Sequence, residues 1–226
     1  MTRARGGTAG DHRRPERLIG IPALARVIEG MRAEHPARSG RLLVGLVGAP
    51  GAGKSTVAAE LAARVPGVAV LPMDGFHLPQ ARLRQLDRRE RMGAPDTFDV
   101  AGFATLLAAL RDVDNSGRTV LAPGFAREIE EPVADQIALR PELSTVIVEG
   151  NYLLLDDAGW GAVAPLLHAT VGIVIDDAVR RDRLIERHIA FGKSPDAART
   201  WALGPDERNA VAIAATLERA DYLLSP

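Results

Sequence analysis

The stretch "GAPGAGKST", residues 48–56, decides the fold, because it joins a glycine-rich turn to a lysine and a hydroxyl at fixed spacing. It matches the pattern G-x-x-x-x-G-K-[ST] through Gly48, Gly53, Lys54 and Ser55. Glycines let the backbone curl until successive N–H groups point at one anion, and the amino end of a following helix adds its positive dipole. Lys54 is one of only two lysines in the chain, which argues against a chance match.

The motif predicts a loop that holds the phosphates of a nucleoside triphosphate, with Lys54 on the β- and γ-phosphates and the Ser55 hydroxyl on Mg²⁺. The predicted nucleotide contacts are Gly48, Ala49, Pro50, Gly51, Ala52, Gly53, Lys54, Ser55 and Thr56. The alternative interpretation is a glycine-rich turn before a helix. The motif by itself does not separate a kinase from a GTPase or a motor.

Outward from the loop, short apolar runs alternate with helical segments. Residues 41–48 precede the loop as a strand, and 54–65 follow it as a helix. Further strands are predicted near 68–73, 144–150 and 168–177, with a last short one near 221–226, and a helix over 15–35 that breaks near Gly20. Near-continuous apolar strands between helices indicate a parallel sheet covered on two faces. We therefore predict an α/β fold with a five-stranded, mainly parallel sheet.

Length and composition fit one compact domain over residues 18–226, after a tail at 1–17. Residues 117–139 interrupt the alternation and predict a small antiparallel flap. The formal net charge of −1 gives no basic field for a nucleic-acid partner, and no apolar run reaches the roughly 18 residues of a membrane span. The chain has no cysteine, which excludes disulfides and is compatible with the cytoplasm. The oligomeric state is not set by the sequence, and a homodimer is one option.

A second acidic group is expected beside the metal, at the end of a neighbouring strand. Glu149 ends the run "TVIVEG", whereas Asp156 and Gly159 fit the D-x-x-G spacing of GTP-binding switches. We favour Glu149, because its strand is β-branched and no N-K-x-D base-reading motif follows Asp156. A solvated strand end and a helix cap are the plain alternatives for the two positions.

Asp74 follows another strand, in "VAVLPMDGFHLPQ". A carboxylate at this place could accept the proton of an attacking hydroxyl. Asp-Gly is also a common turn pair, and spacing alone leaves the two interpretations even.

Five segments in order carry a family resemblance: "GAPGAGKST", "MDGFHL", "RMGAPDTFDVAGF", "VIVEGNYLLLD" and "RDRLIERHIAFG". From about residue 42 to 224 the chain resembles the uridine kinase, pantothenate kinase and phosphoribulokinase superfamily of P-loop kinases. The likeness is greatest to the small bacterial nucleoside/nucleotide kinase family, which includes fructose-transport kinases. The resemblance implies a P-loop NTPase fold with a helical lid near 177–204. It also implies ATP, Mg²⁺ and a small-molecule phosphate acceptor such as a nucleoside, a sugar or a vitamin precursor.

Residue by residue, the resemblance implies that Asp74 is the general base and that Glu149 contacts Mg²⁺ through water. It implies that Arg187 contacts the transferring phosphoryl group, with Arg183 one turn earlier as a second candidate. Arginine suits this task because its fork of donors is permanently charged. The alternative is a solvated helix face, in which these arginines pair with acids of their own helix.

The chain departs from the family pattern in the predicted flap, "GFAREIEEP". Relatives often carry an acid that binds substrate hydroxyls where this chain has Ala126, so recognition of a diol at this position is in doubt. Phe125 and Arg127 flank it, and Arg127 would suit an anionic substrate. His77 and Asn209 complete the predicted substrate contacts, although a loop histidine bonded to backbone is an equal alternative for His77.

Three functions remain open at this point. The first is a metabolite kinase that moves the γ-phosphoryl group of ATP to a small hydroxyl compound. The second is a nucleotide-dependent switch or assembly ATPase, which the Asp156-x-x-Gly159 spacing favours. The third is a nucleotide-binding module without catalysis, against which the four intact groups Lys54, Ser55, Asp74 and Glu149 argue.

Overall fold

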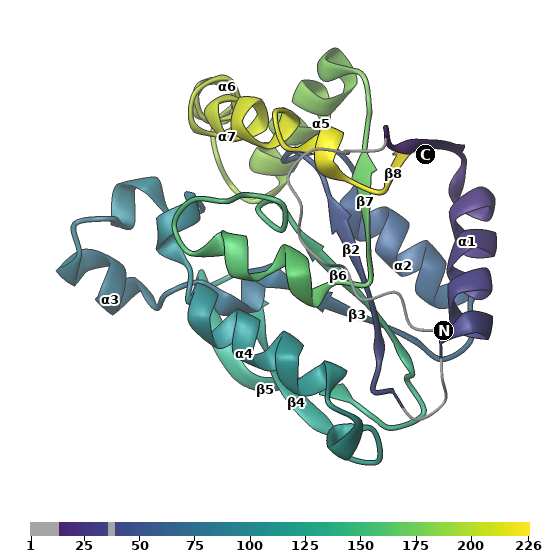
Figure 1. Ribbon diagram of the computed structural model, residues 1–226. Helices are drawn as coiled ribbons and strands as arrows, with labels where there is room; N and C mark the ends of the chain where they lie inside the picture. Colours follow the sequence, from purple (N-terminus) through teal and green to yellow (C-terminus); the bar gives the residue numbers. More distant parts are fainter. Residues whose placement is uncertain (1–13, 36–38) are drawn as a thin grey trace.

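A six-stranded parallel sheet forms the centre of the protein (Figure 1). The computed structural model describes residues 14–35 and 39–226. The strand order is β1-β8-β7-β2-β6-β3. The strands are β1 (Glu16–Ile19), β2 (Leu42–Val47), β3 (Val68–Pro72), β6 (Thr145–Gly150), β7 (Ala169–Ile173) and β8 (Tyr222–Ser225).

The predicted five strands are therefore one too few. The extra strand is β1, which we expected to belong to a helix, and its residues Glu16 and Arg17 lie inside the predicted tail. Residues 1–13 of that tail lie outside the described residues. β1 has four residues and pairs only with β8, about 200 positions away, so no local pattern marks it.

Helices cover both faces of the sheet. Helices α1 (Ile21–Glu34) and α2 (Lys54–Arg64) pack on one face and α4 (Val100–Arg111) on the other, as Figure 1 shows. Alternate residues of β2 serve the two cores: Leu43 and Val47 face α4, while Leu42, Val44 and Leu46 face α1 and α2. All six residues of β2 are buried, which explains why its sequence is a continuous apolar run.

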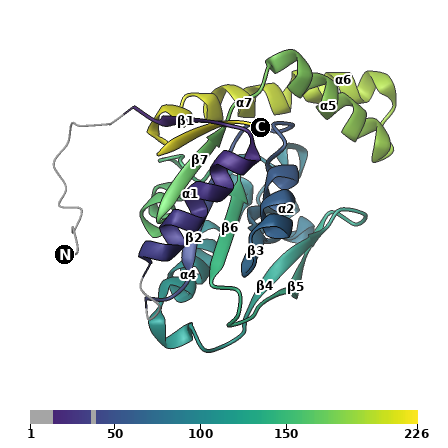
Figure 2. The ribbon, with the colours of Figure 1, turned by 90° about the vertical axis from the view of Figure 1, so that its right-hand side faces the viewer.

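Two further units project from this layered core. One is the antiparallel hairpin of β4 (Val120–Ala126) and β5 (Glu131–Leu139), which lies inside the predicted flap. The other is the group α5 (Asp177–Ala190), α6 (Pro195–Leu203) and α7 (Pro205–Ala214), and the predicted lid covers α5 and α6. Figure 2 shows the hairpin and the α5–α6 pair extending beyond the sheet on the same side. The short helix α3 (Gln80–Gln85) completes the fold.

The sheet register decides where the functional groups lie. Glu149 is opposite Leu46 of β2 and opposite Pro72 of β3. The glycine-rich loop begins two residues beyond Leu46, and Asp74 lies two residues beyond Pro72. Three neighbouring parallel strands therefore deliver the loop, Glu149 and Asp74 to one edge, where the chain crosses from β2 over β6 to β3.

Within the described ranges, none of the helices has both the length and the apolar character that a bilayer crossing requires.

Candidate active site

The glycine-rich loop follows β2 and has the curled backbone that its sequence predicts. Gly51 and Gly53 adopt φ angles of 81° and 89°, in the left-handed region that favours glycine, and α2 begins at Lys54. A Cβ atom on Gly51 would also lie 2.6 Å from the Arg180 carbonyl oxygen and 2.8 Å from Leu184 Cγ. The loop therefore needs glycine both for its own turn and because α5 packs directly against it.

Lys54 is held over the mouth of this loop. Its Nζ donates hydrogen bonds to the carbonyl oxygens of Gly48, at 2.9 Å, and Ala49, at 3.2 Å. Burial lowers the pKa of Lys54 to about 8, with Arg187 adding to the effect and Glu149 and Asp74 opposing it. An anion in the loop would restore a counter-charge to this buried ammonium, which is the behaviour expected of a phosphate ligand.

Ser55 and Glu149 fit a divalent cation with oxygen ligands. The Ser55 hydroxyl donates to Glu149 Oε1 at 3.1 Å. Glu149 Oε2 is buried and has no hydrogen-bond partner among the described residues, and burial raises the pKa of this carboxyl. The described chain holds no cluster of three His, Cys, Asp or Glu side chains that could bind a metal. Two protein oxygens suit Mg²⁺, which keeps several waters and binds substrate phosphates.

The alternative metal acid, Asp156, lies in a different environment. Its carboxylate pairs with Arg219, and its side chain is 79% exposed. No hydrogen bond joins it to Ser55 among the described residues, whereas Glu149 makes that contact directly.

Asp74 sits in a tight 3₁₀ turn, Met73–Phe76, immediately after β3. Its Oδ2 pairs with Arg127 Nη2 at 3.1 Å, and Arg127 is the residue after the last one of β4. The hairpin reaches the turn because Gly75 has no side chain: a Cβ there would lie 2.2 Å from the Pro123 carbonyl oxygen. This ion pair was not foreseen from the sequence, because the two residues are 53 positions apart.

His77 is bound to backbone and packed between two aromatic rings. Its Nδ1 donates to the Asp74 carbonyl oxygen at 2.8 Å, since a carbonyl can only accept. Its ring lies 4.0 Å from the Phe98 ring and 4.7 Å from the Phe125 ring, measured between centroids. Burial lowers the pKa of His77 below its usual value. The backbone-bonded alternative is therefore what the structure has, and the neutral ring still presents Nε2 as an acceptor.

The arginines of α5 divide into two groups. Arg180 and Arg181 both pair with Glu207 of α7, each at 2.6 Å, and so join two helices rather than bind phosphate. Arg183 lies against the loop, because a Cβ on Gly53 would be 3.5 Å from its Nη1. The pKa of Arg187 is lowered by burial and then by Arg127, and no hydrogen bond holds its guanidinium within the described chain. The Arg187 guanidinium has lost water contacts on burial, and hydrogen bonds to an incoming anion would compensate for that loss.

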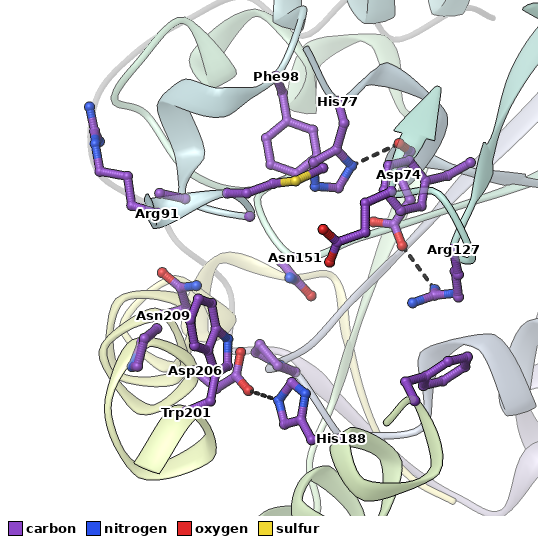
Figure 3. Close-up of a pocket in the computed structure, with 18 of the residues that line it drawn as sticks. Asp74, His77, Arg91, Phe98, Arg127, Asn151, His188, Trp201, Asp206 and Asn209 are labelled. Carbon is purple, nitrogen blue, oxygen red and sulfur yellow. Dashed lines mark hydrogen bonds and ion pairs between the residues drawn. The ribbon is translucent and has the colours of Figure 1, made fainter. Parts of the chain in front are cut away.

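One open cleft of about 1040 Å³ brings most of these groups together (Figure 3). Its lining includes Pro50, Lys54, Ser55, Asp74, His77, Phe125, Arg127, Glu149, Arg187 and Asn209. The charges act on one another across it, since Glu149, Asp74 and Arg187 all shift the pKa of Lys54.

Residues that the sequence analysis did not single out also line the cleft. Figure 3 shows His188 of α5 bonded through Nε2 to Asp206 Oδ2 of α7, at 2.7 Å, beside Trp201 and Asn209. Trp201 carries Lys193 over its ring at 4.7 Å. Asp206 reads in sequence as an ordinary acid in the first turn of a helix, so only the packing of α5 on α7 reveals this pair.

This fold and this loop define a P-loop nucleotide-binding protein, and known proteins show which kind. No protein-family model matches the chain. The Schizosaccharomyces pombe protein named "Putative uridine kinase C227.14" is 35% identical over 162 residues, which are 67% of this chain and 68% of that protein. The "ATP-dependent kinase-like protein notR'" of Aspergillus versicolor is 37% identical over 131 residues, which are 56% of this chain and 76% of that protein.

Among solved structures, the "putative fructose transport system kinase" from Silicibacter sp. TM1040 matches with a TM-score of 0.78 and 38% identity. The match covers 90% of this chain and 98% of that one. The chain therefore belongs to the family of P-loop kinases related to uridine kinase, which confirms the resemblance drawn from the ordered motifs.

Proposed function

We propose that the protein transfers the γ-phosphoryl group of ATP to a hydroxyl group of a small metabolite, with Asp74 accepting the hydroxyl proton. The observation that carries the proposal is the common edge of β2, β6 and β3, which places a phosphate loop and a carboxylate in one cleft. In an ATPase or GTPase a carboxylate at this place would act on a water molecule, whereas the cleft of about 1040 Å³ beside Asp74 has room for a small-molecule acceptor. The names of the relatives, a uridine kinase and an ATP-dependent kinase-like protein, support the same class.

The residues divide the work by position. The loop amides and Lys54 bind the β- and γ-phosphates, and Arg183 and Arg187 from α5 hold the phosphate chain from the other side. Asp74 orients the acceptor hydroxyl and takes its proton as the oxygen attacks phosphorus. The helices α5 and α6 act as a lid that excludes water and limits idle hydrolysis.

Mg²⁺ belongs to the proposal because Ser55 Oγ and the unpartnered Glu149 Oε2 suit it. When bound, the ion neutralises charge on the phosphate oxygens. We also propose a cytoplasmic location and a homodimer. Light scattering of the purified protein would test whether it is a dimer.

The deciding experiment is Asp74→Asn, which keeps the shape of the side chain and removes its basicity. We expect phosphoryl transfer to fall by about 10²- to 10⁴-fold, the usual contribution of a general base. The dissociation constant of ATP should stay within a few-fold of the wild-type value, because the loop on β2 is unchanged. Transfer at the wild-type rate in this variant would refute the assignment. Hydrolysis stimulated by a protein partner, with no transfer to any small molecule, would favour the switch ATPase instead.

A further inference from the structure

Arg127 occupies a place in the cleft that the proposed function leaves without a task. Its guanidinium lies 3.1 Å from the carboxylate oxygen of the proposed base, as Figure 3 shows. The side chains of Arg127 and Asp74 are 48% and 34% exposed, so both can be reached by a ligand entering the cleft. A cation therefore lies directly beside the point where the acceptor hydroxyl has to bind.

The backbone imposes this neighbourhood. The β4 strand approaches the Asp74 turn so closely that only glycine fits at position 75. Arg127 follows the end of that strand, at the start of the hairpin turn. Phe125, two residues earlier, packs on the His77 ring and holds the same strand end. The hairpin thus delivers Arg127 to Asp74 through contacts of its main chain and of a neighbouring ring.

Two guanidinium groups of the cleft act on one another at this point. After burial, Arg127 is the strongest charge that lowers the pKa of Arg187, and Asp206 and Asp74 oppose it. The guanidinium of Arg127, from the hairpin, and that of Arg187, from α5, therefore repel one another. Asp74 pairs with Arg127. Asp74 offsets the charge of Arg127 only while the two are paired, so an acceptor hydroxyl that takes over Asp74 leaves Arg127 in need of another anion.

The pairing also conflicts with base catalysis. Asp74 Oδ2 already accepts a hydrogen bond from Arg127 Nη2, so this oxygen has to give up or share that partner before it can accept from an acceptor hydroxyl. An acceptor with a negative group of its own removes the conflict. That group takes over the fork of Arg127, and the carboxylate is left free for the hydroxyl.

We propose that the phosphate acceptor is an anionic hydroxy compound, either a hydroxy acid or a phosphorylated polyol, whose negative group binds Arg127 while its hydroxyl faces Asp74. This rests on the proposed function and narrows its substrate class. The hydroxyl oxygen bonds to the γ-phosphorus, the bond to the β-phosphate oxygen breaks, the proton goes to Asp74 and ADP leaves. The negative group takes no part in the bond changes.

His77 adds a second point of recognition. Its Nδ1 is committed to the Asp74 carbonyl oxygen, so the neutral ring offers only the lone pair of Nε2 to the cleft that it lines. A lone pair accepts from a hydroxyl and repels a carboxylate or phosphate. The acceptor therefore carries its negative group on the Arg127 side and has room for a further hydroxyl on the His77 side.

The test compares neutral and anionic forms of the same carbon skeleton as acceptors. Suitable sets are glycerol with glycerate and glycerol 3-phosphate, fructose with fructose 6-phosphate, and uridine with uridine 5′-monophosphate. The assay measures the release of ADP. We expect the anionic member of the preferred set to have a kcat/KM about 10- to 100-fold above its neutral partner, the value of one charged hydrogen bond. Comparing the carboxylate acceptor with the phosphate acceptors shows which of the two negative groups the site binds.

The variants Arg127→Ala and Arg127→Lys locate the effect. Arg127→Ala should raise KM for the anionic acceptor by about 10- to 100-fold and should not raise it for the neutral acceptor, and Arg127→Lys should fall between wild type and Arg127→Ala. Arg82→Ala is the control, because Arg82 belongs to α3 near the cleft but bonds to Gln85 and does not line it. If Arg127→Ala lowers kcat equally for every acceptor, Arg127 contacts the transferring phosphoryl group and the proposal is wrong.

An untargeted arm covers acceptors outside the panel. The enzyme and ATP are added to a bacterial small-molecule extract, and mass spectrometry identifies compounds that gain a phosphoryl group. An anionic precursor supports the proposal. A neutral precursor overturns it and leaves the proposed kinase function standing. If neither the acceptor panel nor the extract yields a phosphorylated product, both the anionic-acceptor proposal and the proposed kinase function are contradicted.

Discussion

Gly75→Ala would separate the position of the hairpin from the chemistry of Asp74. A Cβ atom at residue 75 would lie 2.2 Å from the Pro123 carbonyl oxygen and 2.7 Å from its carbonyl carbon. Both are backbone atoms of β4, so no flexible side chain can move aside. The strand has to retreat by about 1 Å to restore an ordinary contact distance. The φ angle of Gly75 is not in the left-handed region, so the effect is steric alone.

Two magnitudes follow from this displacement. Overpacking of this kind lowers the free energy of unfolding by about 1–3 kcal/mol. A shift of about 1 Å in a group that positions the substrate costs about 10²-fold in rate. ATP binding should change little, because the loop follows β2 and the substituted residue belongs to the turn after β3.

Urea denaturation, steady-state phosphoryl transfer and ATP titration measure the three quantities. Gly30→Ala is the matched control, because a Cβ there meets nothing within 4 Å and the residue lies inside α1. It should stabilise the protein by about 0.5–1 kcal/mol and leave transfer unchanged. If Gly75→Ala keeps both its stability and its transfer rate, the close approach of β4 does not position the site, and the reasoning fails.

Two further predictions concern the metal and the pH dependence of stability. Glu149→Gln should raise the Mg²⁺ concentration needed for half-maximal transfer by about 10- to 100-fold, while Asp156→Asn, at the exposed alternative acid, should not; equal effects of the two would reject Glu149 as the metal acid. Burial, then the charges of Arg111 and His35, lowers the pKa of His168 to about 4, and the neutral Nδ1 accepts a hydrogen bond from the Leu43 amide. Between pH 6.5 and 4 the folded protein therefore binds fewer protons than the unfolded chain. Stability is lost as the pH falls through that window. Between pH 7.5 and pH 5 this loss should be about 1–2 kcal/mol after allowance for solvent screening, and His168→Asn, whose oxygen can still accept from the amide, should remove it from the urea midpoints; an unchanged pH dependence would show that other groups set it.

The layered core could be predicted from the sequence because its signals are local. Each central strand is an apolar run, each run is followed by a helical segment, and the loop of residues 48–56 carries its own turn chemistry. The strand β1 could not be predicted, because four residues at a sheet edge acquire their structure only by pairing with β8. The same reason made the predicted tail too long by the residues Glu16 and Arg17.

The candidate site divides in the same way. The sequence placed Lys54, Ser55, Asp74, Glu149 and Arg187 in one region, and the cleft brings those five together. Arg180 and Arg181 precede Arg183 and Arg187 on the same helix, and helical spacing does not say which neighbour a side chain meets. Packing of α5 on α7 decided that the first two pair with Glu207.

By itself, the sequence determined the phosphate loop, the parallel sheet and the strand ends that carry acids, because hydrophobic period and turn residues act over a few positions. Only the tertiary structure decided what each acid meets. It placed Glu149 on Ser55 rather than in solvent, and it set Arg127 against Asp74 across 53 positions of chain. Such contacts depend on where separate elements pack and on which backbone atoms leave room, as Gly75 does for β4, and no local pattern records that.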